Sequence, residues 1–529
     1  MNVIVFDFSN SLGGAETFNA RFIEYLVGNG DNVAVVGTEK SILFELLDRK
    51  GIEVKRYIGP ESNDFFVSHE EESALSSFGR KMIEDFDGQD LYVLASYFDV
   101  LHRAMHIFNG DRRVHILTGI LHPESWSIWE PRVGFNASRA FKPKLINKIW
   151  HYQRQLLLRL DRAHAIWYPN DIYRKYNSEY FSVPLCHNSS ATVPVEPVKQ
   201  KIGYNISAPK ESMRVLWLGR FDFFKNESIF SFIDSLNVVL NNKPHLYISF
   251  DLIGYGYAIY EDEVKSYKKL AHARLDIRIL GKKNESEIYG IIESEKYHFG
   301  VAMGSSAYHL AMIGLPVIAI DSCVKGYRRL VKGIWLDEAS DEFDEGSSLY
   351  LSLIGESSPQ RNDIHVMLED VFRDGFLKEK SRSCCNYVEQ FHNIDIVFPK
   401  IRGFLLGSSF SEKFTYRFER NLPDEFYYRF GRKKDINIAI FGTGSGASKF
   451  YGKLISDLVF SDVGVNVKCF FDNDDSKVGA MFCNTKIERF TLESANELDV
   501  VVIASEYWPE IKTQMISCGL TRSKILRAY

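Results

Sequence analysis

The sequence lacks several features that would assign a chain to a class at once. Its seven cysteines include no CxxC pair, which disfavours a zinc site and a disulfide framework. No apolar run approaches the roughly 18 residues of a membrane-spanning helix. The start, MNVIVFDFSNSLGG, lacks the basic segment and long apolar core of a signal peptide. The net charge of -5 is unlike that of a general nucleic-acid binder. We therefore expect a cytoplasmic protein without nucleic-acid partners or a metal site.

Short apolar runs alternate with helical stretches along most of the 529 residues. Predicted strands lie at 3–8, 33–37, 91–95, 114–119 and 165–169, and then at 215–219, 247–254, 276–281, 299–303 and 316–320. These runs are apolar throughout, which is typical of parallel strands covered on both faces. The pattern predicts two doubly wound α/β domains joined by a polar linker at 193–212. We place the domains at 1–200 and 201–380, a connector at 407–432 and a small third α/β domain at 433–529.

In each of the two large domains, one glycine-containing turn comes directly after the first strand. In SNSLGGAE (9–16), Gly13 and Gly14 would let a ligand approach the backbone closely. In LGRFDFFKN (218–226), Gly219 precedes Arg220, and Lys225 follows five residues after that arginine. A guanidinium and an ammonium group on one strand-to-helix loop can converge on a diphosphate. The alternative is a solvated pair of surface cations.

A third turn opens the stretch GSSAYHLAMIGLPVIA (304–319). Gly304, Ser305 and Ser306 resemble a helix cap, and the helix start offers the backbone N–H groups of Ser305, Ser306 and Ala307. A helix N-terminus of this kind favours an anion. The alternative is a serine-capped helix that only packs.

Together, these motifs resemble GT-B fold glycosyltransferases of the retaining family 4 type. The matching pieces are GGAE, VLWLGRFDFFKN, DLIGYGY (251–257) and AMIGLPVIA (311–319), in the family's order over roughly residues 1–405. The resemblance implies two Rossmann-like domains facing a cleft, with a helix near 380–405 that crosses back to the first. It also implies a nucleotide-sugar donor, a retaining outcome without a required metal, and Arg220 and Lys225 neutralising the departing diphosphate.

Two histidines enter through this resemblance. His122, in LTGILHPESW (117–126), matches the position of a family histidine that contacts the donor sugar near the reacting carbon. His309 stands where the family usually has a glutamate that binds nucleotide-sugar hydroxyls. The second acidic position of that pattern falls near Val301, which is apolar. An imidazole can still bond a hydroxyl, but it does not offer two carboxylate oxygens.

Residues 132–162 hold eight Lys/Arg and one acid, Asp161. A possible apolar side of this helix consists of Leu145, Ile149, Trp150, Leu156 and Leu160. One hypothesis is a helix lying on an anionic membrane at its inner face, near lipid-linked acceptors. The other is a helix whose apolar side packs in the first domain while its basic side is solvated.

The third domain begins with IFGTGSGASKF (440–450). Gly442, Gly444 and Ala447 fit the G-x-G-x-x-A form of the dinucleotide fingerprint, and Asp472 ends the next predicted strand, where an acid could meet a ribose. Structural or docking use, nucleotide binding and independent chemistry all stay open for this domain.

The leading hypothesis is a glycosyltransferase that moves sugar from a nucleotide donor to a glycan or lipid-linked saccharide in bacterial surface polysaccharide synthesis. One alternative is a catalytically silent GT-B module that binds glycans or scaffolds a partner. Another places an NAD(P)- or nucleotide-dependent activity on sugars in the third domain, where it would require Gly442 and Gly444.

Overall fold

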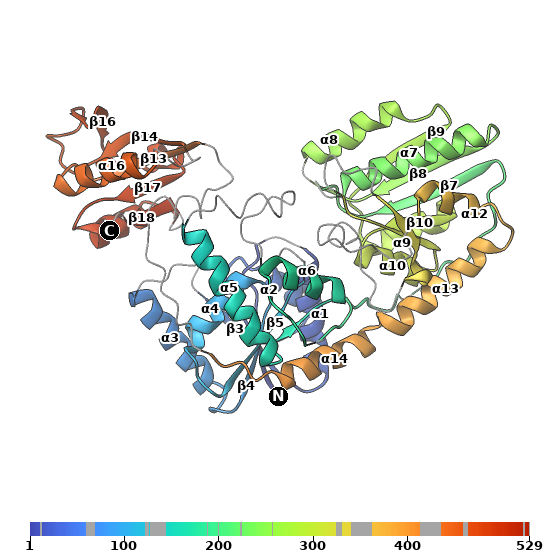
Figure 1. The fold of residues 1–529 in the computed structure, drawn as a ribbon, viewed down its shortest axis with the longest axis horizontal. Helices are drawn as coiled ribbons and strands as arrows, with labels where there is room; N and C mark the ends of the chain where they lie inside the picture. The colour runs from blue at the N-terminus through green and yellow to red at the C-terminus, as the bar shows by residue number, and fades with distance from the viewer. Residues whose placement is uncertain are drawn as a thin grey trace. The chain divides into compact units, whose positions relative to one another are not determined.

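The chain is described here by a computed structural model (Figure 1). The residues that it describes are 1–10, 13–59, 69–121, 126, 144–187, 189–198, 200–222, 225–256, 258–323, 331–339, 362–412, 435–458, 464–521 and 524–527. Two compact units are present, one formed by Met1–Gly59, Ser68–Ile128 and Arg154–Phe414, the other by Pro60–Val67, Trp129–Gln153 and Thr415–Tyr529. Within the described ranges the chain forms three six-stranded sheets, two of them in the first unit and one in the second.

The first sheet is parallel and has the order β3-β2-β1-β4-β5-β6. Its strands are β1 (Asn2–Phe6), β2 (Asn32–Gly37), β3 (Lys55–Ile58), β4 (Leu91–Ala95), β5 (Val114–Gly119) and β6 (Ile166–Trp167). The helices between and after them are α1 (Gly14–Gly28), α2 (Ile42–Lys50), α3 (His69–Glu84), α4 (Phe98–Phe108), α5 (Lys144–Arg162) and α6 (Asp171–Phe181). The strand predicted at 3–8 ends at Phe6, because Asp7 uses its carboxylate to accept the Ser9 N–H at 2.9 Å. Beyond Phe6, the Asp7 N–H still donates to the Val36 carbonyl at 2.9 Å.

The second sheet has the order β12-β11-β10-β7-β8-β9 and is parallel except for the β11–β12 pair. Its strands are β7 (Ser212–Leu218), β8 (Tyr247–Ile253), β9 (Leu275–Gly281), β10 (Phe299–Ala302), β11 (Val317–Ile320) and β12 (Gly333–Trp335). Its helices are α7 (Asn226–Asn242), α8 (Ala258–Tyr267), α9 (Glu285–Glu295), α10 (Ser305–Ile313) and α12 (Ile364–Asp370). All four residues of β10 are buried, and β7 is buried at Met213 and from Val215 to Trp217, as continuous apolar runs predict.

Two helices, α13 (Phe376–Phe391) and α14 (Ile394–Gly407), follow the second sheet. The single helix predicted near 380–405 is therefore wrong in detail, since it is broken at His392 and Asn393. The Asn393 side chain caps α14 by accepting the Asp395 N–H at 2.9 Å, and the His392 carbonyl accepts the Val195 N–H at 2.8 Å. Helix α13 packs against α10, whereas α14 packs against β4 and β5 of the first sheet. The pair thus links the two sheets of the first unit.

The third sheet has the order β15-β16-β14-β13-β17-β18, with only the β15–β16 pair antiparallel. Its elements are β13 (Asp435–Phe441), α16 (Ser445–Leu458), β14 (Gly464–Phe471), β15 (Met481–Phe482), β16 (Thr485–Glu488), α17 (Leu492–Asn496), β17 (Val500–Ile503), α18 (Trp508–Ser517) and β18 (Ile525–Arg527). The predicted fold class is confirmed, because all three sheets are α/β with mainly parallel strands.

The basic segment at 132–162 is described only from Lys144, where α5 begins. Leu156 and Leu160, which the membrane hypothesis placed on an exposed apolar side, are fully buried. For this half of α5 the burial of these leucines agrees with the other hypothesis, in which the apolar side packs in the first domain. No helix within the described ranges combines the length and apolar composition that crossing a bilayer requires.

Candidate functional site

The strand order of the second sheet reverses between β7 and β10, which are neighbours in the sheet but not in the sequence. Leu218, the last residue of β7, pairs in register with Ala302, the last residue of β10. The loops that start at Gly219 and Met303 therefore leave the sheet side by side. In open α/β sheets, ligands bind beyond the carboxyl ends of the strands at such a reversal.

The loop after β7 is held by the loop after β8. The N–H groups of Gly219 and Phe221 donate to the carbonyls of Ile253 and Tyr255 at 3.0 and 2.9 Å, and Phe221 pairs with Gly256. A Cβ on Gly254 would lie 1.9 Å from the Gly219 carbonyl oxygen, so only glycine permits this approach. The close approach of the two loops thus explains the glycine at position 254 of the motif DLIGYGY, which the sequence alone did not explain.

Arg220 lies between these two anchored residues. Phe221 is buried, whereas Arg220 is exposed, and within the described ranges its guanidinium makes no ion pair. Lys225 ends the same loop as the N-cap residue of α7, and its N–H donates to the Asp222 carbonyl at 2.9 Å. Both cations therefore belong to one strand-to-helix connection at the carboxyl edge of the sheet.

The N-terminus of α10 follows β10 directly. Gly304 is its N-cap residue with φ 62° and ψ −146°, a conformation that suits only glycine. The predicted serine cap is wrong: no side chain caps this helix, and Ser305 is its first residue. The Ala307 N–H already donates to the Gly304 carbonyl at 2.8 Å. Among the described backbone hydrogen bonds none uses the N–H of Ser305 or Ser306, so these two amides are available at the N-terminus of α10.

His309 lies one helical turn after Ser305, on the same side of α10. Its side chain is half-buried, and burial lowers the pKa of its imidazole. The ring is therefore neutral at pH 7 and offers one donor and one acceptor. Val301 is fully buried in β10 and contributes no polar group.

In the first sheet, Gly13 is the extended N-cap residue of α1. Its carbonyl accepts the Thr17 hydroxyl at 2.9 Å, and a Cβ on Gly13 would lie 2.7 Å from the Glu16 carboxylate. Gly14, the first residue of α1, has open space where a side chain would be. His122 lies outside the described residues, so its predicted role stays a prediction.

Asp7 is an ionisable residue of this edge that the sequence reasoning missed. It lies after β1, which neighbours β4 at the strand-order reversal of the first sheet. Its carboxylate accepts hydrogen bonds from the Ser9 N–H and the Asn19 amide, each at 2.9 Å. Burial raises the pKa of Asp7 to about 6. In the sequence, the run VIVFDF predicts a strand that includes Asp7, so Asp7 was not considered as a residue of the site.

Tyr97, which follows β4, has a φ of 79°, a strained value for a residue with a side chain.

The two glycines of the predicted fingerprint lie in the loop after β13, and Ala447 lies in the first turn of α16. Gly442, with φ 110°, donates its N–H to the Phe471 carbonyl at 2.8 Å, and Ala447 is buried beneath. Gly444 has open space at its Cα. The Thr443 hydroxyl donates to the Asp472 carboxylate. Burial alone would raise the pKa of Asp472, but this bond and the Asp474 N–H hold it below the usual value. The acid predicted to meet a ribose thus already has a partner that the sequence reasoning missed.

No group of three His, Cys, Asp or Glu side chains in the described part of the chain is arranged to hold a metal ion.

Comparisons with known proteins agree with this geometry at the level of fold. Residues 434–526 match the family model of the N-terminal domain of C2185-like proteins. A comparison with curated proteins by sequence gives no match. Among solved structures, a glycosyltransferase from Rickettsia africae ESF-5 is 10% identical, with a TM-score of 0.52, over 76% of this chain and 97% of the other. The crystal structure of TarM is also 10% identical, with a TM-score of 0.50, over 76% of this chain and 98% of the other. The first two sheets therefore have the GT-B glycosyltransferase fold, and a further α/β domain follows them.

Proposed function

We propose that this chain transfers a glycosyl group from a nucleotide-sugar donor to a saccharide acceptor. The observation that carries the proposal is the pairing of Leu218 with Ala302, which sets the Arg220 loop beside the N-terminus of α10. A GT-B fold with a cationic loop and a helix N-terminus at one strand-order reversal suits a diphosphate. The acceptor class, a glycan or lipid-linked saccharide of a bacterial surface polysaccharide, comes from the sequence resemblance.

The chemistry follows from charge. Cleavage of the bond between sugar and diphosphate leaves negative charge on the departing phosphate oxygens. Arg220 and Lys225 would stabilise that charge, and the amides of Ser305 and Ser306 would donate hydrogen bonds to the same oxygens. The backbone that carries these groups is anchored at the sheet edge, which limits the reorganisation that accompanies the reaction. We propose a retaining transfer that requires no metal, as the resemblance implies.

His309 would take part in donor recognition as a neutral imidazole. Its position on the face of α10 that carries Ser305 allows a hydrogen bond with a hydroxyl of the nucleotide sugar. A silent GT-B module is the second candidate function, and one observation favours it. Both acidic positions of the family pattern are replaced, by His309 and by the buried Val301.

A binding screen tests the donor site. The purified chain is titrated with UDP-, GDP-, ADP-, dTDP- and CMP-sugars, and with NAD and NADP, and binding is measured by calorimetry and thermal shift. We expect one nucleotide sugar to bind, and the double variant Arg220→Ala/Lys225→Ala to lose that binding while keeping its circular dichroism spectrum. A matched control, Lys269→Ala/Lys400→Ala, removes two exposed cations elsewhere and should bind as the wild type does.

Release of free nucleotide from the bound donor separates an enzyme from a silent module. Hydrolysis or transfer that is lost in the Arg220/Lys225 variant supports the proposed reaction. Tight donor binding with no turnover on any saccharide acceptor would instead favour the silent module. Binding of NAD or NADP alone, dependent on Gly442, would move the ligand site to the third domain and contradict the proposal.

A further inference from the structure

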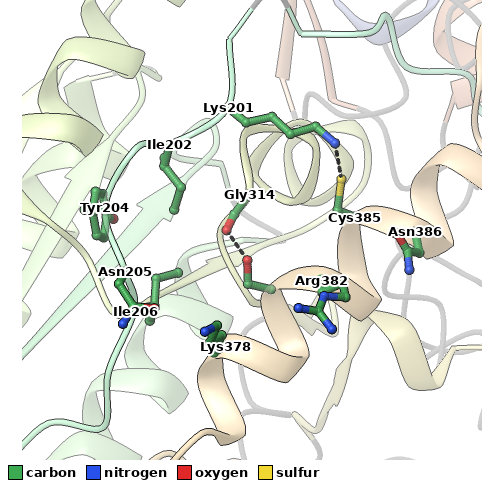
Figure 2. A pocket seen from close by; sticks show the side chains of 11 residues that line it. Lys201, Ile202, Tyr204, Asn205, Ile206, Gly314, Lys378, Arg382, Cys385 and Asn386 are labelled. Atoms are coloured by element: carbon green, nitrogen blue, oxygen red, sulfur yellow. Dashed lines mark hydrogen bonds between the residues drawn. The ribbon is translucent and has the colours of Figure 1, made fainter.

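A groove of about 300 Å³ lies between the segment 201–206 and helix α13, at the Gly314 end of α10 (Figure 2). The proposed donor site lies at the opposite end of α10, where Ser305 begins the helix. The groove is therefore separate from that site. No residue that lines it has a place in the proposed transfer reaction.

The walls of this groove are fixed by hydrogen bonds. The Ile202 N–H donates to the Ile313 carbonyl at 2.8 Å, and the Tyr289 hydroxyl donates to the Lys201 carbonyl at 2.8 Å. On the facing side, the Ser381 hydroxyl donates to the Gly314 carbonyl at 2.6 Å. Figure 2 shows that last bond together with the contact between Lys201 and Cys385. A groove held in this way is formed before any ligand arrives.

The lining carries three cations and no carboxylate: Lys201, Lys378 and Arg382. Glu389 pairs with Lys201 at 2.9 Å, which offsets one of the three charges. Lys378 and Arg382 form no ion pair with any residue in the described ranges, and both are exposed. They lie four residues apart on α13, so their like charges repel each other.

The position of these cations on α13 favours an anion further. The helix begins at Phe376, so Lys378 lies in its first turn together with Glu379, and the helix dipole there favours negative charge and disfavours a lysine. Asn386 follows Arg382 by four residues along the same helix, and Asn205 lies across the groove. Their amide groups add hydrogen-bond donors beside the two cations.

We propose that this groove binds a phosphoryl group. A tetrahedral phosphate accepts several hydrogen bonds at once, and a planar guanidinium beside an ammonium group is suited to that geometry. Bound there, the anion would relieve the repulsion between Lys378 and Arg382 and join α13 to the segment 201–206. The inference is independent of the proposed transfer reaction, because it uses none of the donor-site residues.

Calorimetry with inorganic phosphate on the full chain tests the site. The donor-loop variant Arg220→Ala/Lys225→Ala serves as the background, since phosphate also suits that loop. In this background, Lys378→Gln/Arg382→Gln should weaken phosphate binding at least about tenfold. The matched Lys269→Gln/Lys400→Gln pair should leave it unchanged. Equal affinity in the groove variant and its control would overturn the proposal.

Two sources of the phosphoryl group are distinguished by vesicle flotation. If the ligand is a lipid headgroup, the chain should float with phosphatidic acid vesicles, not with phosphatidylcholine vesicles, and Lys378→Gln/Arg382→Gln should abolish flotation. If the ligand is a soluble phosphate compound, calorimetric binding should appear without flotation. A chain that binds neither phosphate nor phosphatidic acid vesicles contradicts the inference. Circular dichroism of each variant confirms that a loss of binding is not a loss of folding.

Discussion

At the scale of single residues, two buried side chains give the stability of the first unit opposing pH dependences. Asp7 is buried beyond β1, and burial raises its pKa from the ordinary 3.8 to about 6. His392 is fully buried between α13 and α14, and burial lowers its pKa from 6.5 to about 4. Its ring lies against Tyr308, with the ring centroids 3.8 Å apart. In the wild type the two effects partly cancel between pH 4 and 6.

Replacing Asp7 by Asn should reveal its contribution. The folded state holds the Asp7 proton more tightly than the unfolded chain does, so this residue lowers stability as pH rises from 4 to 6. The free energy of unfolding of Asp7→Asn, relative to the wild type, should therefore rise over that range, by up to about 3 kcal/mol. Urea unfolding at several pH values measures the difference. A difference that stays constant with pH would show that Asp7 is ionised when folded.

His392→Gln should show the opposite sign. The unfolded chain binds a proton at His392 below pH 6.5, whereas the folded chain does so only near pH 4. The wild type therefore loses stability at this residue as pH falls through that range, by up to about 3 kcal/mol. Glutamine does not titrate and can donate to the Val193 carbonyl, which lies 3.0 Å from the histidine Nδ1. Relative to the wild type, the variant should gain stability toward acid in the same urea experiment.

At the scale of elements, the close contact between the loops after β7 and β8 positions Arg220. A Cβ on Gly254 would meet the Gly219 carbonyl oxygen at 1.9 Å, so Gly254→Ala must push the Arg220 loop away. We expect a loss of about 2–3 kcal/mol of stability and a weaker donor affinity. The control is Gly290→Ala, because Gly290 lies exposed in α9 with open space around its Cα. That change should stabilise the chain by about 0.5–1 kcal/mol. Unaltered donor binding in Gly254→Ala would separate this glycine from the site.

Element types were predictable from local sequence, but element ends depended on distant partners. The strands of the second sheet followed from continuous apolar runs, since a parallel strand needs apolar residues on both faces. The break between α13 and α14 did not, because it depends on pairing between Val195 and Asn393, far apart in the sequence. The serines after Gly304 looked like caps, yet the backbone conformation of Gly304 starts the helix one residue earlier than a Ser305 cap would.

At the scale of the whole molecule, the sequence predicts those parts of the candidate site whose positions follow from the order of the strands in the sheet. The proximity of the Arg220 loop and the start of α10 follows from the right-handed rules for parallel strands, which make β7 and β10 neighbours. The buried carboxylate of Asp7 was not predictable, because a single Asp in an apolar run gives no sign of its burial. Neither was Thr443, whose role requires the end of β14 to lie beside the loop after β13.

Helix α14 packs against the first sheet, although it follows the second sheet in the sequence. Phe398 is fully buried, with its ring centroid 5.8 Å from Phe18, 5.2 Å from Phe22 and 5.4 Å from Tyr25. On the same helix, Arg402 donates two hydrogen bonds of 2.9 Å to Asp31, which also pairs with the chain's first amino group. The first sheet therefore depends on residues that lie almost four hundred positions later.

Phe398→Ala should test this dependence. Loss of the buried ring is expected to cost about 3–5 kcal/mol, and the cavity would form against α1. Hydrogen exchange read by mass spectrometry should therefore quicken in β1, β2 and α1 while β7 and β8 keep their protection. Ile396→Ala, a partly exposed position on the same helix, serves as the control and should change neither region. Equal loss of protection in both sheets would mean instead that the two sheets unfold as one cooperative body.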